Sequence, residues 1–404
     1  MACHDVVVTG IGWQTALGDT VTEVWSKIGQ GETGIDRIPL ADPASGYGVN
    51  VWAPCAAQLQ FQPTFRLAKK QLRSMSRTSQ LFVAACLNTL VDAGLTPEQI
   101  QDTRMGVLMG TGGSLCDEFA STDLDARSPS WFLNTYPNLP AAYLSLVANI
   151  TGYSTTIVNA CVSSSMAIGQ AFRLIRSGEE ECLLAGGSDS RMTPSYLSGF
   201  SRLGMHTPSV EANTAMRPFD AQRNGFVIGE GAAALLLESE RHAKARGANI
   251  LGYVRGFGVS MDAYRLTDPH ADGKAAAMAR ALRDGQVDAG TIDYINAHGT
   301  STQANDLADL EAIRQLFTGT TPWVNSSKSL FGHTLAASGA IESIICLLSL
   351  QQGHIHANRN LDQPDNHADV RLVGSLPQNT SLRYSLNNSS AIGGCNTSLV
   401  FEKA

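Results

Sequence analysis

Long stretches of a single residue class are absent from this chain of 404 residues. Lysine and arginine form no run beyond short pieces such as Lys69-Lys70, and the formal net charge is −7, which argues against nucleic acid as a partner. No segment approaches ~18 uninterrupted apolar residues, and the N-terminus has no basic region ahead of an apolar one. We therefore expect a cytoplasmic protein without a membrane partner.

Paired cysteines are also absent, because the chain contains no CxxC motif. Such pairs are typical of zinc sites and of disulfide frameworks, so their absence argues against both. The two candidate histidines, His298 and His333, are far apart in sequence and no HExxH motif is present, so we expect no metal site. The cysteines, most of them expected to be reduced and structural, are Cys3, Cys55, Cys86, Cys116, Cys161, Cys182, Cys346 and Cys395.

The chain does contain a regular alternation of strand and helix signals. Residues 6–10 predict a buried strand, and residues 20–23 have the pattern of a capping box that opens a helix. Further short apolar runs predict strands at 106–110, 156–158, 182–185, 251–254, 293–295, 323–325, 382–386 and 399–401. Helical patterns lie near 166–175, 275–282, 307–316 and 341–350. This alternation predicts an α/β fold.

The length favours two fused halves over one small domain, since a chain of this size buries ~75 % of its unfolded surface. A polar helix and turn at 238–247 is the expected join, which gives halves of 1–245 and 246–404. No low-complexity linker separates them, so we expect one packed unit.

One local pattern occurs twice, once with a cysteine and once with a histidine. Residues 155–165 and 292–302 each read as a short apolar strand, then Asn-Ala, then Cys161 or His298, then small hydroxyl residues that open a helix. The likeness predicts a duplicated scaffold whose halves share one active site.

Cys161 is the strongest candidate for a nucleophile. At a strand-to-helix junction, backbone N–H groups and the helix dipole stabilise a thiolate by roughly 0.3 to 1 kcal/mol. The alternative, typical of free cysteines elsewhere, is a buried and inert thiol. His298 and His333 each follow a predicted strand among small residues, although a lone histidine in such a setting is more often a surface loop residue. Together with the cysteine they favour catalysis.

Four segments in order along the chain carry the resemblance to a known family: 158–161, 296–302, 328–333 and 393–396. They resemble the elongating β-ketoacyl-acyl carrier protein synthases, which have the thiolase fold. Supporting stretches lie at 8–12, 217–220, 225–227 and 262–264. The resemblance implies two pseudo-symmetric βαβ halves in a layered αβαβα arrangement, with the cysteine in the first half and both histidines in the second.

The resemblance also implies the chemistry of an acyltransferase. Cys161 would take an acyl chain from an acyl carrier protein, while His298 and His333 would stabilise the enolate formed when a malonyl-carrier loses carbon dioxide. Lys328 would orient this network with Glu342 as its carboxylate partner, the alternative for the two being a purely structural ion pair.

Further roles follow from the same resemblance. The backbone N–H groups of Cys161 and Ile392 would form an oxyanion hole, and Thr300, Thr302 and Phe226 would contact the phosphopantetheine arm. The carrier protein brings that arm, so no cofactor is expected. The implied partners are acyl- and malonyl-loaded carrier protein and a second subunit, either another copy or a chain-length-factor-like homologue.

Two pairs of charged residues match family positions without entering the expected catalytic set. Lys70 and Arg73 fall near positions that dock the acidic carrier, although lone surface charges are more often just solvated. Asp306 and Asp309 match acidic positions below the active site, and their roles could be purely structural.

One departure from the family concerns the gate over the cysteine. Elongating synthases normally read Phe-Gly-Phe-Gly-Gly, whereas this chain reads Ser-Ala-Ile-Gly-Gly at 390–394. Ala391 and Ile392 therefore make a different gate, which favours a specialised polyene, aryl-polyene or polyketide pathway. The alternative is an ordinary synthase of fatty acid elongation.

Three other classes of the superfamily agree less well with this sequence. A thiolase needs a second catalytic cysteine, for which Cys395 is the candidate, and we interpret it as a packing substitution. An initiating synthase pairs its cysteine with a histidine and an asparagine, whereas both positions here are histidine. A chain-length factor lacks the nucleophile, and Cys161 argues against it.

Overall fold

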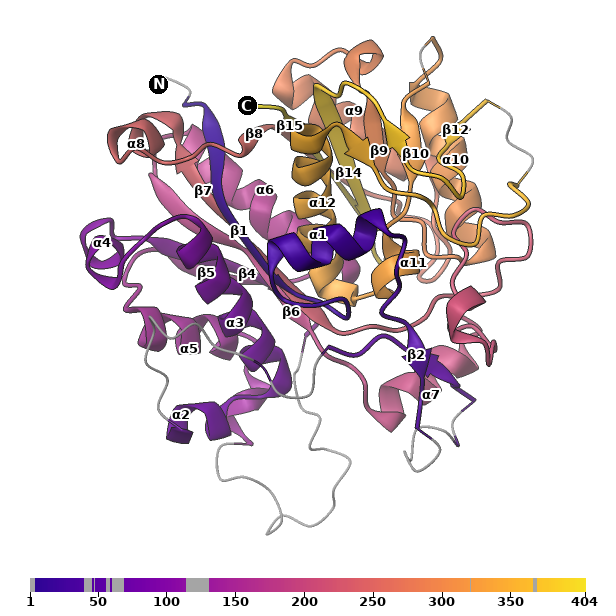
Figure 1. Cartoon of the computed structure of the whole chain (residues 1–404), viewed down its shortest axis with the longest axis horizontal. Helices are drawn as coiled ribbons and strands as arrows, with labels where there is room; N and C mark the ends of the chain where they lie inside the picture. Colours follow the sequence, from indigo (N-terminus) through magenta and orange to yellow (C-terminus); the bar gives the residue numbers. More distant parts are fainter. Residues whose placement is uncertain are drawn as a thin grey trace.

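The structure is a computed structural model that describes residues 4–39, 46, 48–55, 59, 69–113, 131–319, 321–365 and 369–404. Its central feature is a single sheet of 11 strands (Figure 1). From one edge to the other the strands are β12 (Arg371–Leu372), β10 (Trp323–Asn325), β9 (Tyr294–Asn296), β14 (Tyr384–Ser390), β15 (Cys395–Glu402), β8 (Gly252–Met261), β1 (Val6–Gln14), β7 (Gly231–Ser239), β6 (Cys182–Asp189), β4 (Gly106–Thr111) and β5 (Ser154–Val158).

Apart from the edge strand β12, the sheet consists of two topologically equivalent halves that meet where β1 pairs with β8. In chain order, the first half places its strands as first, fifth, fourth, second, third (β1-β7-β6-β4-β5), and β8-β15-β14-β9-β10 repeats that order. The directions also match, because each half begins with two antiparallel pairings and continues with two parallel ones. The predicted duplication is confirmed.

The sequence predicts that the segments carrying Cys161 and His298 are counterparts in the two halves, and this prediction is wrong. Cys161 follows β5, the third strand of its half, whereas His298 follows β9, the second strand of the other half. The topological counterpart of β5 is β10, and the chain after β10 carries Lys328 and His333. The Asn-Ala likeness therefore reflects two similar strand ends, since in each the chain leaves a parallel strand and turns towards a helix, although β9 is buried and β5 is exposed or half-buried.

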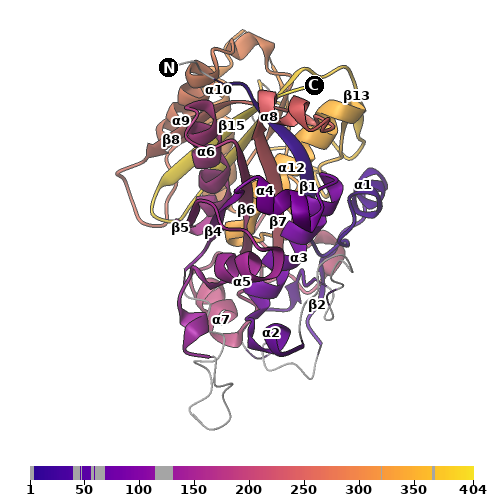
Figure 2. The ribbon, with the colours of Figure 1, turned by 90° about the vertical axis from the view of Figure 1, so that its left-hand side faces the viewer.

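Helices cover the sheet in three layers. The central layer contains α6 (Ser163–Arg176) and α12 (Ser338–Gln352), which contact each other and strands of both halves. One outer layer has α3 (Arg77–Asp92) beside α5 (Leu139–Ala148), and the other has α9 (Ala271–Gly285) beside α10 (Gln303–Leu316), as Figures 1 and 2 show. The arrangement is the αβαβα order that the resemblance implies.

The remaining elements lie at the periphery or in connections. Thr20 caps α1 (Val21–Gly29) by accepting from the N–H of Glu23, but the Glu23 carboxylate pairs with Lys27, so only one half of the predicted capping box is present. The peripheral and connecting elements are α1 (Val21–Gly29), α2 (Lys69–Ser74), α4 (Pro97–Asp102), α7 (Pro194–Arg202), α8 (Glu240–Ala245), α11 (Lys328–Phe331), β2 (Asp36–Arg37), β3 (Val51–Trp52), β11 (His354–Ile355) and β13 (Gln378–Asn379).

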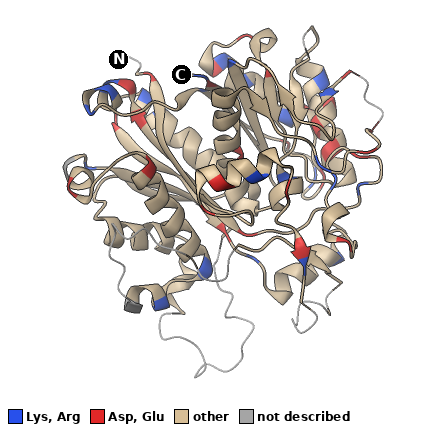
Figure 3. Cartoon of the chain, viewed as in Figure 1, with Lys and Arg blue, Asp and Glu red and all other residues tan. Residues whose placement is uncertain are grey.

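The predicted strands and helices are all present, several of them longer than the sequence indicates. The polar join contains α8, and the boundary between 1–245 and 246–404, which falls between α8 and β8, stays a prediction. Basic and acidic residues are interspersed over the described ribbon (Figure 3), in keeping with the modest net charge of −7.

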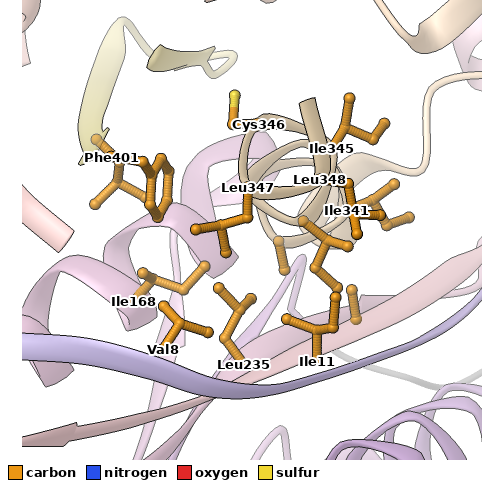
Figure 4. Close-up of a cluster of buried hydrophobic side chains, with 14 of the residues drawn as sticks. Val8, Ile11, Ile168, Leu235, Ile341, Ile345, Cys346, Leu347, Leu348 and Phe401 are labelled. Atoms are coloured by element: carbon orange, nitrogen blue, oxygen red, sulfur yellow. The ribbon is translucent and has the colours of Figure 1, made fainter. Parts of the chain in front are cut away.

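The main core forms where α12 packs on the middle of the sheet. Figure 4 shows Ile341 and Leu347 of this helix facing Val8, Ile11 and Leu235 of β1 and β7. The stretch Leu335–Gln352 is long and apolar enough to cross a membrane, although polar residues such as Ser338 and Glu342 interrupt it. It is 89 % buried inside the protein, so its apolar character is that of a core helix.

Candidate active site

Cys161 sits in a sharp turn between β5 and α6. Ala160 adopts a left-handed conformation with φ of +45°, which for a residue with a side chain costs on the order of 1–3 kcal/mol. Ser163 supports the turn, because its Oγ accepts from the Asn159 N–H at 2.8 Å and lies 2.7 Å from the Ala160 carbonyl oxygen. The strained turn aims the thiol into the protein, where Cys161 is buried.

A cavity of about 380 Å³ joins the residues that the sequence and the resemblance single out for contact with substrate. Its walls include Cys161, Phe226, His298, Thr300, Thr302, His333, Ala391 and Ile392. Lys328 and Glu342 are buried behind His298. Residues from both halves of the fold thus meet around one thiol, as predicted.

The imidazoles of His298 and His333 lie 5.3 Å apart, centroid to centroid, at an interplanar angle of 84°. The backbone N–H of Leu335 donates to Nδ1 of His333 at 3.3 Å, and Ser338 Oγ lies 3.1 Å from the same atom. Because Nδ1 accepts a hydrogen bond, the proton of the neutral ring is on Nε2. His333 is therefore a donor through Nε2.

Lys328 fixes His298 in the same tautomer. Its Nζ donates to the His298 carbonyl oxygen at 2.5 Å, lies 3.4 Å from Nδ1 of that ring, and forms an ion pair with Oε1 of Glu342. Three acceptors match the three protons of an ammonium group. Nδ1 of His298 accepts, so its Nε2 also carries the proton.

Both histidines are neutral near pH 7. Burial lowers the pKa of His298 and of His333 well below 6.5, and the positive charge of Lys328 lowers both further. Burial raises the pKa of Glu342, which the Lys328 ammonium opposes. The site therefore presents two uncharged donors backed by a buried ion pair.

The thiolate stabilisation expected at Cys161 is not what the structure shows. Burial raises the pKa of this thiol to about 12, although Lys328 and a hydrogen bond from the Ile392 N–H act in the opposite direction. A helix end contributes roughly 0.3–1 kcal/mol, less than one pKa unit, so it cannot offset complete desolvation. The Cys161 side chain is therefore a protonated thiol near neutral pH.

The altered gate is a tight turn between β14 and β15. The Ala391 N–H donates to the Cys395 carbonyl at 2.9 Å, and the Gly393 N–H donates to the Leu266 carbonyl at 2.8 Å. Gly393, with φ of +95°, takes the left-handed conformation of the turn. Ile392 is 40 % exposed beside the cavity, and its N–H reaches the Cys161 sulfur.

Cys395 is engaged in packing contacts. It is buried, and its Sγ accepts a hydrogen bond from Asn159 Nδ2 at 3.2 Å. The interpretation of Cys395 as a packing substitution stays a prediction.

The residues expected at the pantetheine arm lie along the cavity wall. The hydroxyls of Thr300 and Thr302 are 2.9 Å apart. Phe226 packs edge-on against His333 and against Phe200, each at 5.3 Å between centroids. Arg73 is exposed on α2, whereas the side chain of Lys70 lies outside the described part of the chain.

The acidic pair below the site is structural in its contacts. Asp306 accepts the N–H groups of Ser301 and Phe219, and Asp309 accepts the Gly299 N–H at 2.7 Å. These bonds shape the loop that carries His298. The sequence reasoning missed the residues that complete this region, Lys274 and Asn305, because nothing in their local sequence signals a polar network.

One cluster of ligand-type side chains lies elsewhere: Cys182, Glu238 and His242 have ligand atoms within 4.8 Å of one another. Burial acts to raise the pKa of Glu238, but hydrogen bonds from Arg246, His242 and Thr9 lower it to about 2. The guanidinium of Arg246 already compensates this carboxylate. The contacts of Glu238 thus form an ion-paired network between the strands and α8.

A thiol and two neutral imidazole donors at the junction of two equivalent α/β halves define a condensing enzyme of thiolase-like fold. The β-ketoacyl synthase N-terminal domain family matches residues 4–243, and the C-terminal domain family matches residues 251–362. The chain belongs to the β-ketoacyl synthase family, whose members are acyltransferases.

Named relatives and solved structures cover the whole chain. The 3-oxoacyl-[acyl-carrier-protein] synthase 2 of Vibrio harveyi is 36% identical over 100% of this chain and 99% of its own. The Staphylococcus aureus synthase 2 is 33% identical over 98% of both chains. A β-ketoacyl synthase from Burkholderia phymatum superposes with a TM-score of 0.92 at 33% identity, covering 99% of this chain and 100% of that one. The ishigamide ketosynthase/chain length factor gives 0.91 at 31% identity, with 100% of both chains covered.

Proposed function

We propose that this enzyme condenses a malonyl-carrier with an acyl group held on Cys161, and that it serves a specialised polyene, aryl-polyene or polyketide pathway. The observation that carries the proposal is the single cavity shared by the Cys161 thiol and two neutral, Nε2-protonated histidines. A second candidate function is primary fatty acid elongation, which the names of the synthase 2 relatives favour.

In the first step the Cys161 sulfur attacks the thioester carbonyl of an acyl-carrier. A carbon–sulfur bond forms to Cys161, the bond to the carrier sulfur breaks, and the thiol proton passes to the released carrier sulfur. The N–H groups of Cys161 and Ile392 would hold the carbonyl oxygen as it gains negative charge. Each such donor contributes on the order of 3 kcal/mol in comparable sites.

In the second step the two histidines hold the thioester oxygen of the malonyl group. Loss of carbon dioxide leaves an enolate, whose oxygen accepts hydrogen bonds from His298 Nε2 and His333 Nε2. The enolate carbon then attacks the acyl-Cys161 carbonyl, and the Cys161 thiolate leaves and takes a proton from solvent. The product is a β-ketoacyl-carrier two carbons longer.

The phosphopantetheine arm of the carrier supplies the thioester, so we propose that the enzyme uses no cofactor or metal of its own. Thr300 and Thr302 present hydroxyls along the cavity wall, where the amides of the arm would bind. One similar structure, AntDE:AntF, is described as a ketosynthase complexed with its acyl-carrier protein, at 27% identity and a TM-score of 0.88. We extend such a partner to this enzyme, with Lys70 and Arg73 as docking residues.

We further propose that the enzyme is cytoplasmic and works as a dimer, through the edge strand β5. This strand is the last of the described sheet, and its residues are exposed or half-buried, with Val158 50 % exposed. An exposed strand edge is a template for pairing with another chain. The partner is another copy or a chain-length-factor-like homologue.

Reconstitution tests the proposed reaction. Purified enzyme, hexanoyl-carrier and malonyl-carrier should yield a β-ketooctanoyl-carrier and one carbon dioxide per product, detected by mass. Repeating the assay with a polyunsaturated and a saturated acyl-carrier in competition tests the pathway. Release of carbon dioxide without any longer carrier product would contradict the condensation, and preference for the saturated chain would favour fatty acid elongation.

A further inference from the structure

A second buried ammonium lies beside the active site, on α9. Lys274 is 4 % exposed, and its Nζ lies 2.8 Å from Asn305 Oδ1, 2.7 Å from Asp309 Oδ1 and 2.8 Å from Ser390 Oγ. Three acceptors again match the three protons of an ammonium group. The three acceptors come from two elements, α10 and the end of β14, so the lysine joins both of them to its own helix α9.

Two of these partners line the cavity itself. Asn305 and Ser390 are cavity-wall residues, and the second carboxylate oxygen of Asp309 accepts the N–H of Gly299, the residue after His298. Ser390 directly precedes Ala391 and Ile392. Lys274 therefore connects the gate turn to the start of α10 and to the loop that carries a catalytic histidine.

The hydrogen bonds and ion pair of Lys274 are expected to fix the geometry of their partners more than to add stability. A buried lysine-carboxylate pair gains little net stability over apolar residues of the same size, because both charges must leave water. Its hydrogen bonds nevertheless demand one arrangement of their partners. Ser390 offers the hydroxyl that this arrangement needs, which the phenylalanine more usual at this position lacks.

We propose that Lys274 is a positioning residue: through Ser390 it holds the gate turn so that the Ile392 N–H stays at the Cys161 thiol. The inference rests on the proposed function of Cys161 as the acylated nucleophile. Without the Lys274–Ser390 contact, the turn would keep its bonds to Cys395 and Leu266, and Ser390 would keep its strand pairing with Asn396, but the Ser390 side chain would lose the bond that ties this end of the turn to α9.

The test measures the rate constant of Cys161 acylation in a single turnover at saturating acyl-carrier. Ser390→Ala and Lys274→Met should each lower it about tenfold with an unchanged KM for the carrier, the scale of a modest misplacement of a reacting group. The double variant should be no slower than Lys274→Met, because both changes break one connection. Ser390→Thr keeps the hydroxyl and should restore the wild-type rate.

Two control variants and one second readout complete the design. Ser349→Ala removes a buried hydroxyl on α12, and Lys244→Met removes an exposed ammonium on α8, so both should acylate like wild type. Amide hydrogen exchange in the peptide spanning 388–396 reports the gate turn directly. It should speed up in Ser390→Ala and Lys274→Met and stay unchanged in the controls.

The outcomes distinguish failure of the positioning role of Lys274 from failure of the proposed function of Cys161. Multiplicative effects in the double variant, or wild-type acylation and exchange in Ser390→Ala, would overturn the positioning role and leave Lys274 as a structural ion pair. A wild-type enzyme that is never acylated would overturn the proposed function instead. Hydrogen exchange would then still decide whether Lys274 holds the turn.

Discussion

Lys328 donates to the carbonyl oxygen of His298 and lies 3.4 Å from Nδ1 of the same imidazole. One ammonium thus fixes both the backbone and the tautomer of that histidine, while Glu342 neutralises it in a buried setting. The proton of His298 is directed to Nε2 without a charge on the ring. The condensation we propose needs such a neutral donor where an enolate forms.

Replacement of Lys328 should separate this role from stability. Lys328→Met leaves the Glu342 carboxylate buried and unpaired, which is expected to lower the free energy of unfolding by about 3–5 kcal/mol. Adding Glu342→Gln should restore much of that loss, measured by denaturant unfolding. Condensation should stay slow in the double variant, and its recovery along with stability would show that the pair is only structural.

The histidines should be needed for condensation more than for acylation. His298→Ala and His333→Ala are each expected to retain acylation of Cys161 yet lose condensation by roughly 10² or more, the scale for removing one preorganised donor. Acylated enzyme and elongated carrier are quantified by mass in the same reaction. His354→Ala, on β11, is the matched control, and near wild-type condensation in either active-site variant would remove that histidine from the mechanism.

The protonation state of Cys161 can be tested without a carrier protein. Burial raises the pKa of this thiol to about 12, so the thiolate fraction keeps increasing with pH across the whole neutral and mildly alkaline range. The rate of alkylation by iodoacetamide, followed by mass at Cys161, should rise about tenfold per pH unit up to pH ~9 without levelling off. A plateau at neutral pH would show a stabilised thiolate.

The altered gate should set acyl selectivity. Ile392 is β-branched and lacks a flat ring, so the wild-type cavity is expected to accept rigid or unsaturated acyl groups. Ile392→Phe should shift preference towards flexible saturated chains by on the order of 1 to 3 kcal/mol, the range for a change of pocket shape. Competition between a polyunsaturated and a saturated acyl-carrier measures the shift, and an unchanged product ratio would restore the fatty acid interpretation to equal standing.

The three reactive residues could be predicted because their signal is local. Cys161 and His298 follow the short strands β5 and β9, His333 follows the short helix α11 after β10, and the structure brings all three to one cavity. The α/β class could be predicted from the alternation of strand and helix patterns, which depends on neighbours in sequence. The αβαβα order was implied by the family resemblance.

Other features depend on distant parts of the chain and could not be predicted. Ser390 meets Lys274 across 116 residues, and only the tertiary arrangement of β14 and α9 brings them together. The depth at which the Cys161 thiol is buried, which decides its protonation, is likewise a property of the packed layers. The equivalence of β5 with β10 emerges from strand order, which a likeness of short motifs does not reveal.

Acyl transfer to one sulfur is the step on which the proposed function depends. Wild-type enzyme and Cys161→Ala are incubated with an acyl-carrier alone, and the intact mass and the site of any adduct are determined. We expect one acyl group on Cys161 of the wild type and none on the variant, which should stay folded because the change removes only a buried thiol. An adduct of equal amount on Cys161→Ala would contradict the assignment of Cys161 as the nucleophile.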